Sequence, residues 1–174
     1  MKISIHTMAV DSFVPMLESL SACLDKGEAF AKPEGLDLIA ARLAPDMFTL
    51  AQQVQQACHY ATDAASRLTA KGATSMPDVQ TSWTGLKAQI ARTVTLLRAL
   101  PEAAFDGAEE RDCSVEIPGN MVIALNGFTL LRAWSLPHFY FHVVTAYDIL
   151  RHAGVEIGKR DYLSQIGAFL RPKA

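Results

Sequence analysis

Apolar residues recur along this chain at alternating steps of four and three, the spacing that gathers side chains on one face of an α-helix. The pattern is unbroken from Leu43 to Leu68. Its members are Leu43, Met47, Leu50, Val54, Ala57, Ala61, Ala64 and Leu68. It predicts a long helix that begins near Pro45, ends before Lys71, and packs this face into a helix bundle.

The segment before this helix carries the same periodicity. It predicts a first helix over residues 5–26, with Pro15 as the place of a kink or a late start. Gly27 is a natural stop, because glycine readily takes the left-handed conformation that ends helices. A short helix is expected over residues 36–43, before Pro45.

Two more long helices follow. One is predicted from about Asp78, a suitable N-cap, to the residues before Pro101. The other opens at Ser135 and Pro137 and ends near His152. Because this last helix is apolar nearly all round, it must be covered on more than one face, either inside the bundle or in a subunit interface. The second alternative would make the protein a homodimer.

A change of pattern separates the last two long helices. Residues 113–117 alternate polar with apolar, residues 118–120 have the composition of a turn, and residues 121–125 suit a strand. A short helix over residues 128–134 follows. The sequence therefore predicts an all-α, antiparallel four-helix bundle in one domain, residues 1–174, with a small β-hairpin inserted before the last long helix.

Composition and charge narrow the function classes. Half of the 174 residues are hydrophobic and a fifth are charged, with a formal net charge of -2 and no basic run. This balance is typical of a soluble globular protein and argues against partners such as nucleic acid or an anionic membrane surface. No apolar run approaches the roughly 20 residues of a membrane-spanning helix.

The cysteines indicate a reduced setting. Cys23, Cys58 and Cys113 are an odd number without C-x-x-C spacing. Together with an N-terminus that lacks the long apolar stretch of a signal peptide, they favour a cytoplasmic location. Each lies in a helical or strand-like pattern, so each is expected to be a small buried hydrophobic residue.

Two histidines stand out as candidates for chemistry. His138 and His142 lie four residues apart, so one helical turn brings both rings to the same face of the last long helix. Such a pair can hold a metal ion, or it can be two satisfied core side chains. A catalytic metal would need a third protein ligand and an open position for water or substrate.

Three residues are candidates for that third position. His59 lies among polar neighbours of the second long helix and is predicted to face solvent. Gln53 lies at the edge of the packed face, where its amide suits a hydrogen bond to an imidazole better than it suits a transition metal. His6 is in phase with the first helix and faces inward if that helix begins early. Motifs such as G-x-S-x-G, a phosphate-binding glycine loop and H-E-x-x-H are absent from the sequence.

Several stretches resemble a known family. They are Leu43-Ala44-Pro45-Asp46-Met47-Phe48, Gln53-Val54-Gln55, and Leu136-Pro137-His138-Phe139-Tyr140-Phe141-His142 with its continuation to Asp161. The chain is similar to an uncharacterised bacterial family within the DinB/YfiT-like superfamily of proposed metalloenzymes. The resemblance implies a four-helix bundle, often dimeric, of unknown activity.

The wider superfamily carries three metal-binding histidines, one in the second helix and two in an H-x-x-x-H of a later helix. Some of its members transfer or open substrates with low-molecular-weight thiols. By this resemblance His138 and His142 match the H-x-x-x-H, while the second-helix position falls at or near Gln53.

Two hypotheses follow. In the first, the protein is a metal-free helical bundle that works as a homodimer or binds a small ligand between its helices. In the second, it is a metal-dependent enzyme of the thiol-transferase or hydrolase kind. His138 and His142 would then bind Zn²⁺, Ni²⁺ or Fe²⁺, with His59 or His6 as the third ligand.

Overall fold

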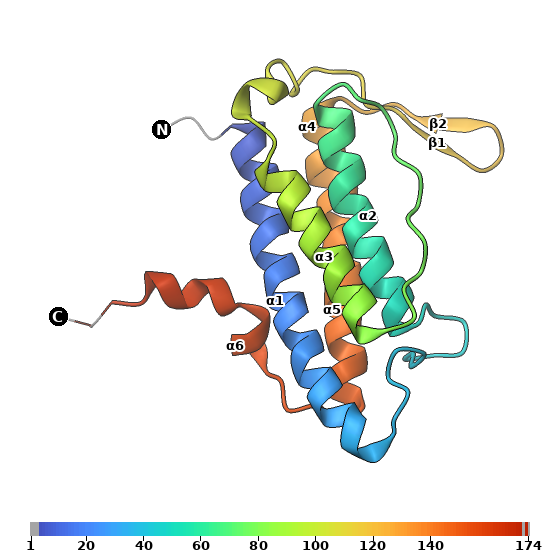
Figure 1. The fold of residues 1–174 in the computed structure, drawn as a ribbon. Helices are drawn as coiled ribbons and strands as arrows, with labels where there is room; N and C mark the ends of the chain where they lie inside the picture. Colours follow the sequence, from blue (N-terminus) through green and yellow to red (C-terminus); the bar gives the residue numbers. More distant parts are fainter. Residues whose placement is uncertain (1–3, 172, 174) are drawn as a thin grey trace.

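The computed structural model describes residues 4–171 and 173 and confirms the predicted helical bundle with its β-hairpin (Figure 1). The long helices are α1 (Ile5–Glu34), α2 (Leu50–Leu68), α3 (Trp83–Arg98) and α5 (Leu136–His152). The shorter elements are η1 (Glu102–Phe105), β1 (Val115–Ile117), β2 (Met121–Ile123), α4 (Gly127–Thr129), the π-helix η2 (Leu130–Ser135), α6 (Lys159–Tyr162) and η3 (Ser164–Phe169). The two strands pair antiparallel, with Glu116 opposite Val122.

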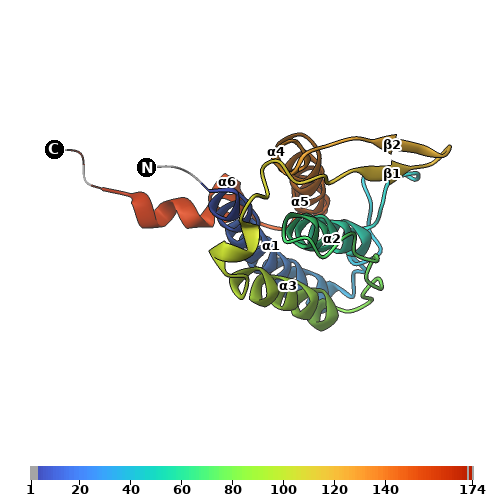
Figure 2. The same ribbon diagram turned by 90° about the horizontal axis from the view of Figure 1, so that it is seen from above.

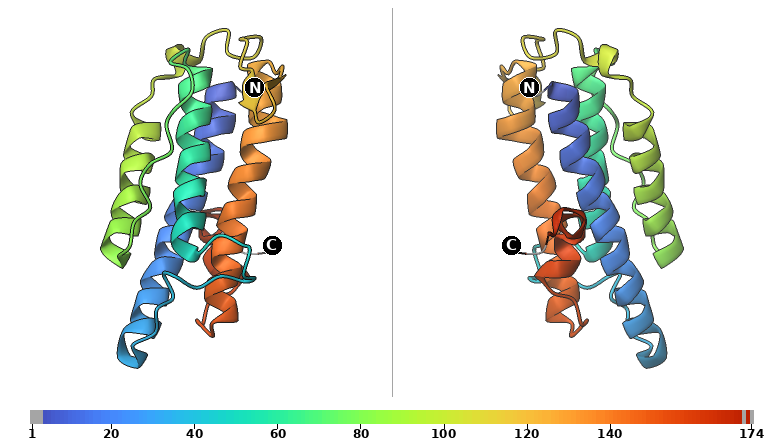
Figure 3. Two further views of the ribbon diagram at one scale, coloured as in Figure 1. Left: turned by 90° about the vertical axis from the view of Figure 1, so that its right-hand side faces the viewer. Right: turned by 90° about the vertical axis from the view of Figure 1, so that its left-hand side faces the viewer.

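The four long helices surround one apolar core. Each of α1 and α2 packs against both α3 and α5, so α3 and α5 lie on opposite sides of the bundle (Figures 2 and 3). The core is filled by most of the positions that the periodicity predicted, although Leu43 and Met47 lie before α2 and outside the buried core. Phe13 of α1 meets Phe139 of α5 edge to face at 4.8 Å between ring centroids. Both rings are fully buried.

The four long helices do not simply alternate in direction along the chain. Two of the packed pairs, α2 with α5 and α1 with α3, are antiparallel, whereas α2 and α3 run in the same direction (Figure 1). The cause is the segment of residues 69–82, which returns along the outside of α2 before α3 begins. We refer to residues 69–82 as the crossover.

Polar side chains of α2 hold the crossover in place. The Asp63 carboxylate accepts a hydrogen bond from the backbone N–H of Thr74 at 2.8 Å and pairs with Arg67 at 2.7 Å. The Gln55 amide donates to the carbonyl of Pro77. Gln55 and Asp63 are therefore each only 7 % exposed, and the polar side of α2 faces another part of the chain.

The first helix is longer than predicted. It continues past Gly27 to Glu34, and Gly35 ends it with a φ of 62° and a backbone N–H bonded to the last turn. Gly27 is a site of close packing: a Cβ there would lie 2.7 Å from a Leu150 methyl carbon. Pro15 lies inside the helix without ending it.

The second and third helices begin later than predicted. The expected helix over residues 36–43 is absent, and α2 starts at Leu50, where Thr49 forms a capping box with Gln52. In the same way α3 starts at Trp83, capped by Ser82, because residues 78–82 belong to the crossover.

The fourth helix continues from earlier helical turns. Residues 127–152 are helical throughout, so Ser135 and Pro137 do not open a helix as predicted; they lie at the junction of η2 and α5. Gly127 is the first residue of this continuous helical segment, which we call the α4–η2–α5 rod. A Cβ at Gly127 would clash with the backbone carbonyl of Ala108. The outer side of α5 is uncovered by this chain, since Phe141 is 57 % exposed.

The C-terminal segment first packs on α1 and then leaves the bundle. Lys26 pairs with Asp161 at 2.6 Å, and the Ser19 and Ser164 hydroxyls lie 2.6 Å apart. Beyond these contacts η3 extends away from the four helices (Figure 1). Within the described residues no helix has the length and apolar character needed to cross a membrane.

Candidate functional site

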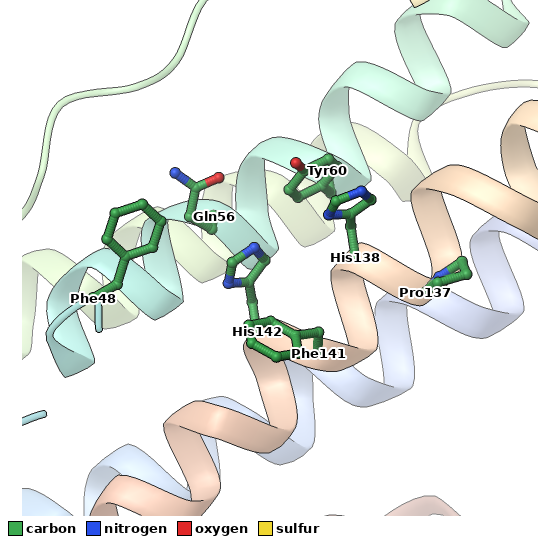
Figure 4. Close-up of a pocket in the computed structure, with 7 residues that line it drawn as sticks. All are labelled: Phe48, Gln56, Tyr60, Pro137, His138, Phe141 and His142. Atoms are coloured by element: carbon green, nitrogen blue, oxygen red, sulfur yellow. The ribbon is translucent and has the colours of Figure 1, made fainter. Parts of the chain in front are cut away.

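The antiparallel contact between α2 and α5 leaves an open pocket of about 620 Å³, which we call the α2–α5 pocket (Figure 4). It is lined by Phe48, Gln56, Tyr60, Pro137, His138, Phe141 and His142. The two histidines project from neighbouring turns of α5 toward α2, as their spacing predicted (Figure 4). No Lys, Arg, Asp or Glu belongs to this lining.

Aromatic rings fill the space between the two helices. The Tyr60 ring stacks on His138 at 4.5 Å between centroids and on His142 at 5.6 Å, with interplanar angles of 12° and 14°. Trp134 packs against His138 at 4.5 Å, and Phe48 stacks on His142 at 6.3 Å. The imidazoles are thus members of an aromatic layer.

His142 has one defined polar partner. Its Nδ1 lies 2.7 Å from the Oε1 of Gln53, and both residues are buried. The Gln53 amide nitrogen donates to the carbonyl of Phe48 at 3.4 Å, which fixes the amide so that its oxygen faces the ring. Nδ1 must then carry the hydrogen, and the Nε2 of a neutral His142 is left as an acceptor.

Burial keeps both imidazoles uncharged. It lowers the pKa of His142 to about 4, with a smaller contribution from the neighbouring His138, because a charged ring loses its hydration there. Burial also lowers the pKa of His138. At neutral pH the pocket therefore presents neutral rings with lone pairs, groups that can accept a hydrogen bond or bind a metal but are weak bases.

The residues present do not fit a three-histidine metal centre. Among residues 4–171 and 173, no three His, Cys, Asp or Glu side chains come close enough together to share a metal ion. Gln53, at the position where the resemblance places the second-helix ligand, uses both polar atoms of its amide on Phe48 and His142. The structure brings together His138, His142 and Gln53 and leaves the first two without a third ligand.

The other predicted candidates lie elsewhere. His59 does not face solvent as predicted: its Nδ1 is buried without a hydrogen-bond partner, and burial lowers its pKa, because the crossover covers this side of α2. His6 lies near the start of α1, with Nε2 3.2 Å from the carbonyl of Leu100 and its ring against Phe105. Neither completes a metal site with the pair on α5.

Sequence reasoning missed Tyr60, Gln56 and Phe48. Tyr60 and Gln56 follow Gln53 at spacings of seven and three, so these three positions of α2 share the flank that meets α5. That spacing was a usable signal. Phe48 has none, because the loop before α2 positions it.

The comparisons with known proteins agree with this fold. Residues 5–163 match the model of a family described as a domain of unknown function, DUF1993. The chain is also similar to a crystal structure of a DinB family member protein from Shewanella denitrificans, with 38 % sequence identity, a TM-score of 0.82 and coverage of 91 % of each chain. No curated protein matches the chain.

Proposed function

The chain belongs to the DUF1993 family of DinB-like helical proteins, and on that premise we propose that it binds a small, flat, uncharged molecule in the α2–α5 pocket. The observation that carries this proposal is the hydrogen bond from His142 Nδ1 to Gln53. It leaves Nε2 of a pocket-lining ring free to accept a hydrogen bond from a ligand.

The lining selects the chemical class of the ligand. Aromatic and imidazole faces favour a flat partner, with each ring pair contributing about 0.5–1.5 kcal/mol beyond burial of area. A charged ligand would lose its hydration in a pocket without an ionised partner, which is costly. An N–H or O–H donor on the ligand would pair with His142.

A titration with probe molecules tests the proposal. Indole supplies a flat face and an N–H donor, 1-methylindole lacks the donor, and benzoate adds a charge. By NMR we expect indole to shift the His142 and Tyr60 resonances at lower concentration than either of the others does. The variant His142→Phe should abolish the preference for indole over 1-methylindole, whereas His152→Gln, at the exposed end of the same helix, should keep it. Equal shifts by all three probes would contradict the proposal.

A metal-dependent thiol transferase or hydrolase is the second candidate. The observation in its favour is that His138 and His142 line one pocket and both stay neutral, the form that binds Zn²⁺, Ni²⁺ or Fe²⁺. Elemental analysis of untagged protein, compared with the His138→Ala/His142→Ala variant, separates the two. Stoichiometric metal that is lost in the variant would favour the enzyme.

A homodimer in the cytoplasm completes the proposal. Its support is the uncovered outer face of α5, where Phe141 is 57 % and Val144 38 % exposed, together with three buried cysteine thiols that form no disulfide. Light scattering of Val144→Ser, which lies outside the lining of the α2–α5 pocket, against the native chain tests the dimer, which should dissociate more readily in the variant. A native monomer at micromolar concentration would exclude it.

A further inference from the structure

A second hollow lies on the other side of α2, bordered by α2, α3 and the crossover and partly open to solvent, and it is separate from the α2–α5 pocket. Its volume is about 200 Å³, and we call it the α2–α3 cavity. Its lining includes Gln89 and Thr93 of α3 together with Thr62 of α2, with Arg92 also contributing.

Gln89 is the feature that distinguishes this cavity. Its side chain is 4 % exposed, yet neither its amide oxygen nor its amide nitrogen has a hydrogen-bond partner among the described residues. Buried amides are almost always bonded, because each polar atom taken from water without a replacement costs free energy. A donor and an acceptor, side by side, therefore line a cavity that could hold their partners.

The surrounding groups add polarity and one charge. Thr93 is 6 % exposed. The single hydroxyl hydrogen of Thr62 is shared between the carbonyls of Cys58 and His59, each 3.0 Å away, which leaves the hydroxyl oxygen able to accept. Arg92 is exposed and forms no ion pair within residues 4–171 and 173. The only ionised side chain in the lining is thus a cation.

We propose that the α2–α3 cavity binds a small carboxylate with a neighbouring hydroxyl or amino group. The carboxylate would accept hydrogen bonds from the amide nitrogen of Gln89 and pair with Arg92. The hydroxyl or amino group would donate to the amide oxygen of Gln89. This arrangement supplies hydrogen-bond partners for both polar atoms of the buried Gln89 amide and an anionic partner for the Arg92 guanidinium.

The size of the cavity favours an organic ligand over a single bound water. A water molecule occupies about 30 Å³ in the liquid, far less than the volume available beside Gln89. Ordered waters alone would satisfy the amide without any preference for charge, so they are the competing outcome of the test.

Three probes separate these outcomes in a ¹H–¹⁵N NMR titration of the full chain. L-lactate carries both the carboxylate and the donor, propionate lacks the donor, and lactamide lacks the charge. We expect L-lactate to shift the side-chain NH₂ resonances of Gln89 and the amides around Thr93, with at least several-fold weaker binding of propionate and lactamide. Unchanged Gln89 resonances with all three probes would leave water as the occupant and overturn the proposal.

Two variants link the response to the named side chains. Gln89→Leu should abolish binding of L-lactate. Arg92→Gln, an exposed change that leaves the core intact, should weaken it several-fold and keep the proposal testable if Gln89→Leu fails to fold. Arg98→Gln, on the same helix but outside the cavity, is the matched control and should bind as the native chain does. Loss of binding in the control alone would count against the assignment.

Discussion

The amide oxygen of Gln53 and the Nδ1 of His142 lie 2.7 Å apart in the buried contact between α2 and α5. The bond sets which nitrogen of His142 carries its hydrogen and which remains available to the pocket. It also occupies the side chain at the position where the family resemblance places the second-helix metal ligand. The proposed function can therefore be tested at this pair of residues.

Replacing Gln53 with leucine should destabilise the protein by about 1–3 kcal/mol, because the Nδ1–H of His142 would stay buried without an acceptor. Chemical denaturation measures the change. Gln56→Leu, one turn further along α2 and only partly buried, is the control and should change the free energy of unfolding by less than about 0.5 kcal/mol. Similar effects of both substitutions would mean that the bond contributes little.

The pKa of His142 predicts a loss of stability in acid. Because the folded pKa is about 4 and the ordinary value is 6.5, the unfolded chain binds the proton first as the pH falls. Stability is complete above pH 6.5 and declines from there to about pH 4, with a slope of at most about 1.4 kcal/mol per pH unit from this residue. The pH dependence of the free energy of unfolding should be flatter in His142→Gln than in the native chain.

A histidine at position 53 should create the metal site that the native residues do not form. In Gln53→His, three imidazoles from α2 and α5 would face one another, the ligand number of a catalytic zinc site. We expect elemental analysis after incubation with Zn²⁺ to give more bound metal per chain in this variant than in the native protein. The gain should disappear in Gln53→His/His138→Ala.

Gly127 should tolerate no side chain. A Cβ at this position would clash with the carbonyl of Ala108 and a methyl group of Leu68, so Gly127→Ala is expected to lower the free energy of unfolding by about 1–3 kcal/mol or more. Gly167→Ala is the matched control, because nothing lies within 4 Å of a Cβ there. Thermal unfolding of both variants decides whether the start of the α4–η2–α5 rod depends on this approach.

Asp63 should control the mobility of the crossover. In Asp63→Ala the backbone N–H of Thr74 loses its acceptor, and Arg67 loses its ion-pair partner while it keeps the carbonyl of Ser114. Hydrogen exchange should then accelerate at residues 72–79 and remain slow in the core of α2, which is held by packing. Asp78→Ala changes an acidic residue of the same segment that has no such contact within residues 4–171 and 173, and it should leave exchange as it is.

The sequence predicted the helices better than their ends. The apolar spacing from Leu43 to Leu68 identified α2 and its packed face, because core burial follows periodicity, but it continued two positions before the helix begins at Leu50. Gly27 was wrongly predicted to end the first helix, because the sequence alone does not distinguish a glycine that permits close packing from one that ends a helix. Only Leu150 and Trp83, distant in the chain, show which role it has.

The candidate site was predicted only in part, because some of its contacts come from parts of the chain that are distant in sequence. The i, i+4 spacing correctly placed His138 and His142 on one face, and the chemistry of an amide suggested Gln53 as an imidazole partner. The environment of His59 could not be read from its helix, because the crossover that covers it comes from residues 69–82. Tyr60 and Phe48 were missed, since their roles depend on how α2 meets α5.

The crossover places long stretches of chain between helices that pack together. The consecutive helices α1 and α2 run antiparallel and touch across the bundle, but the most extensive antiparallel contacts join helices that are not consecutive. The antiparallel partners, α1 with α3 and α2 with α5, are each separated by a whole intervening helix, and such distant contacts slow folding. On a chain that emerges from its N-terminus, α2 must wait for the C-terminal third before it meets α5. The α2–α5 pocket can therefore form only after the segment that contains α5 has been synthesised.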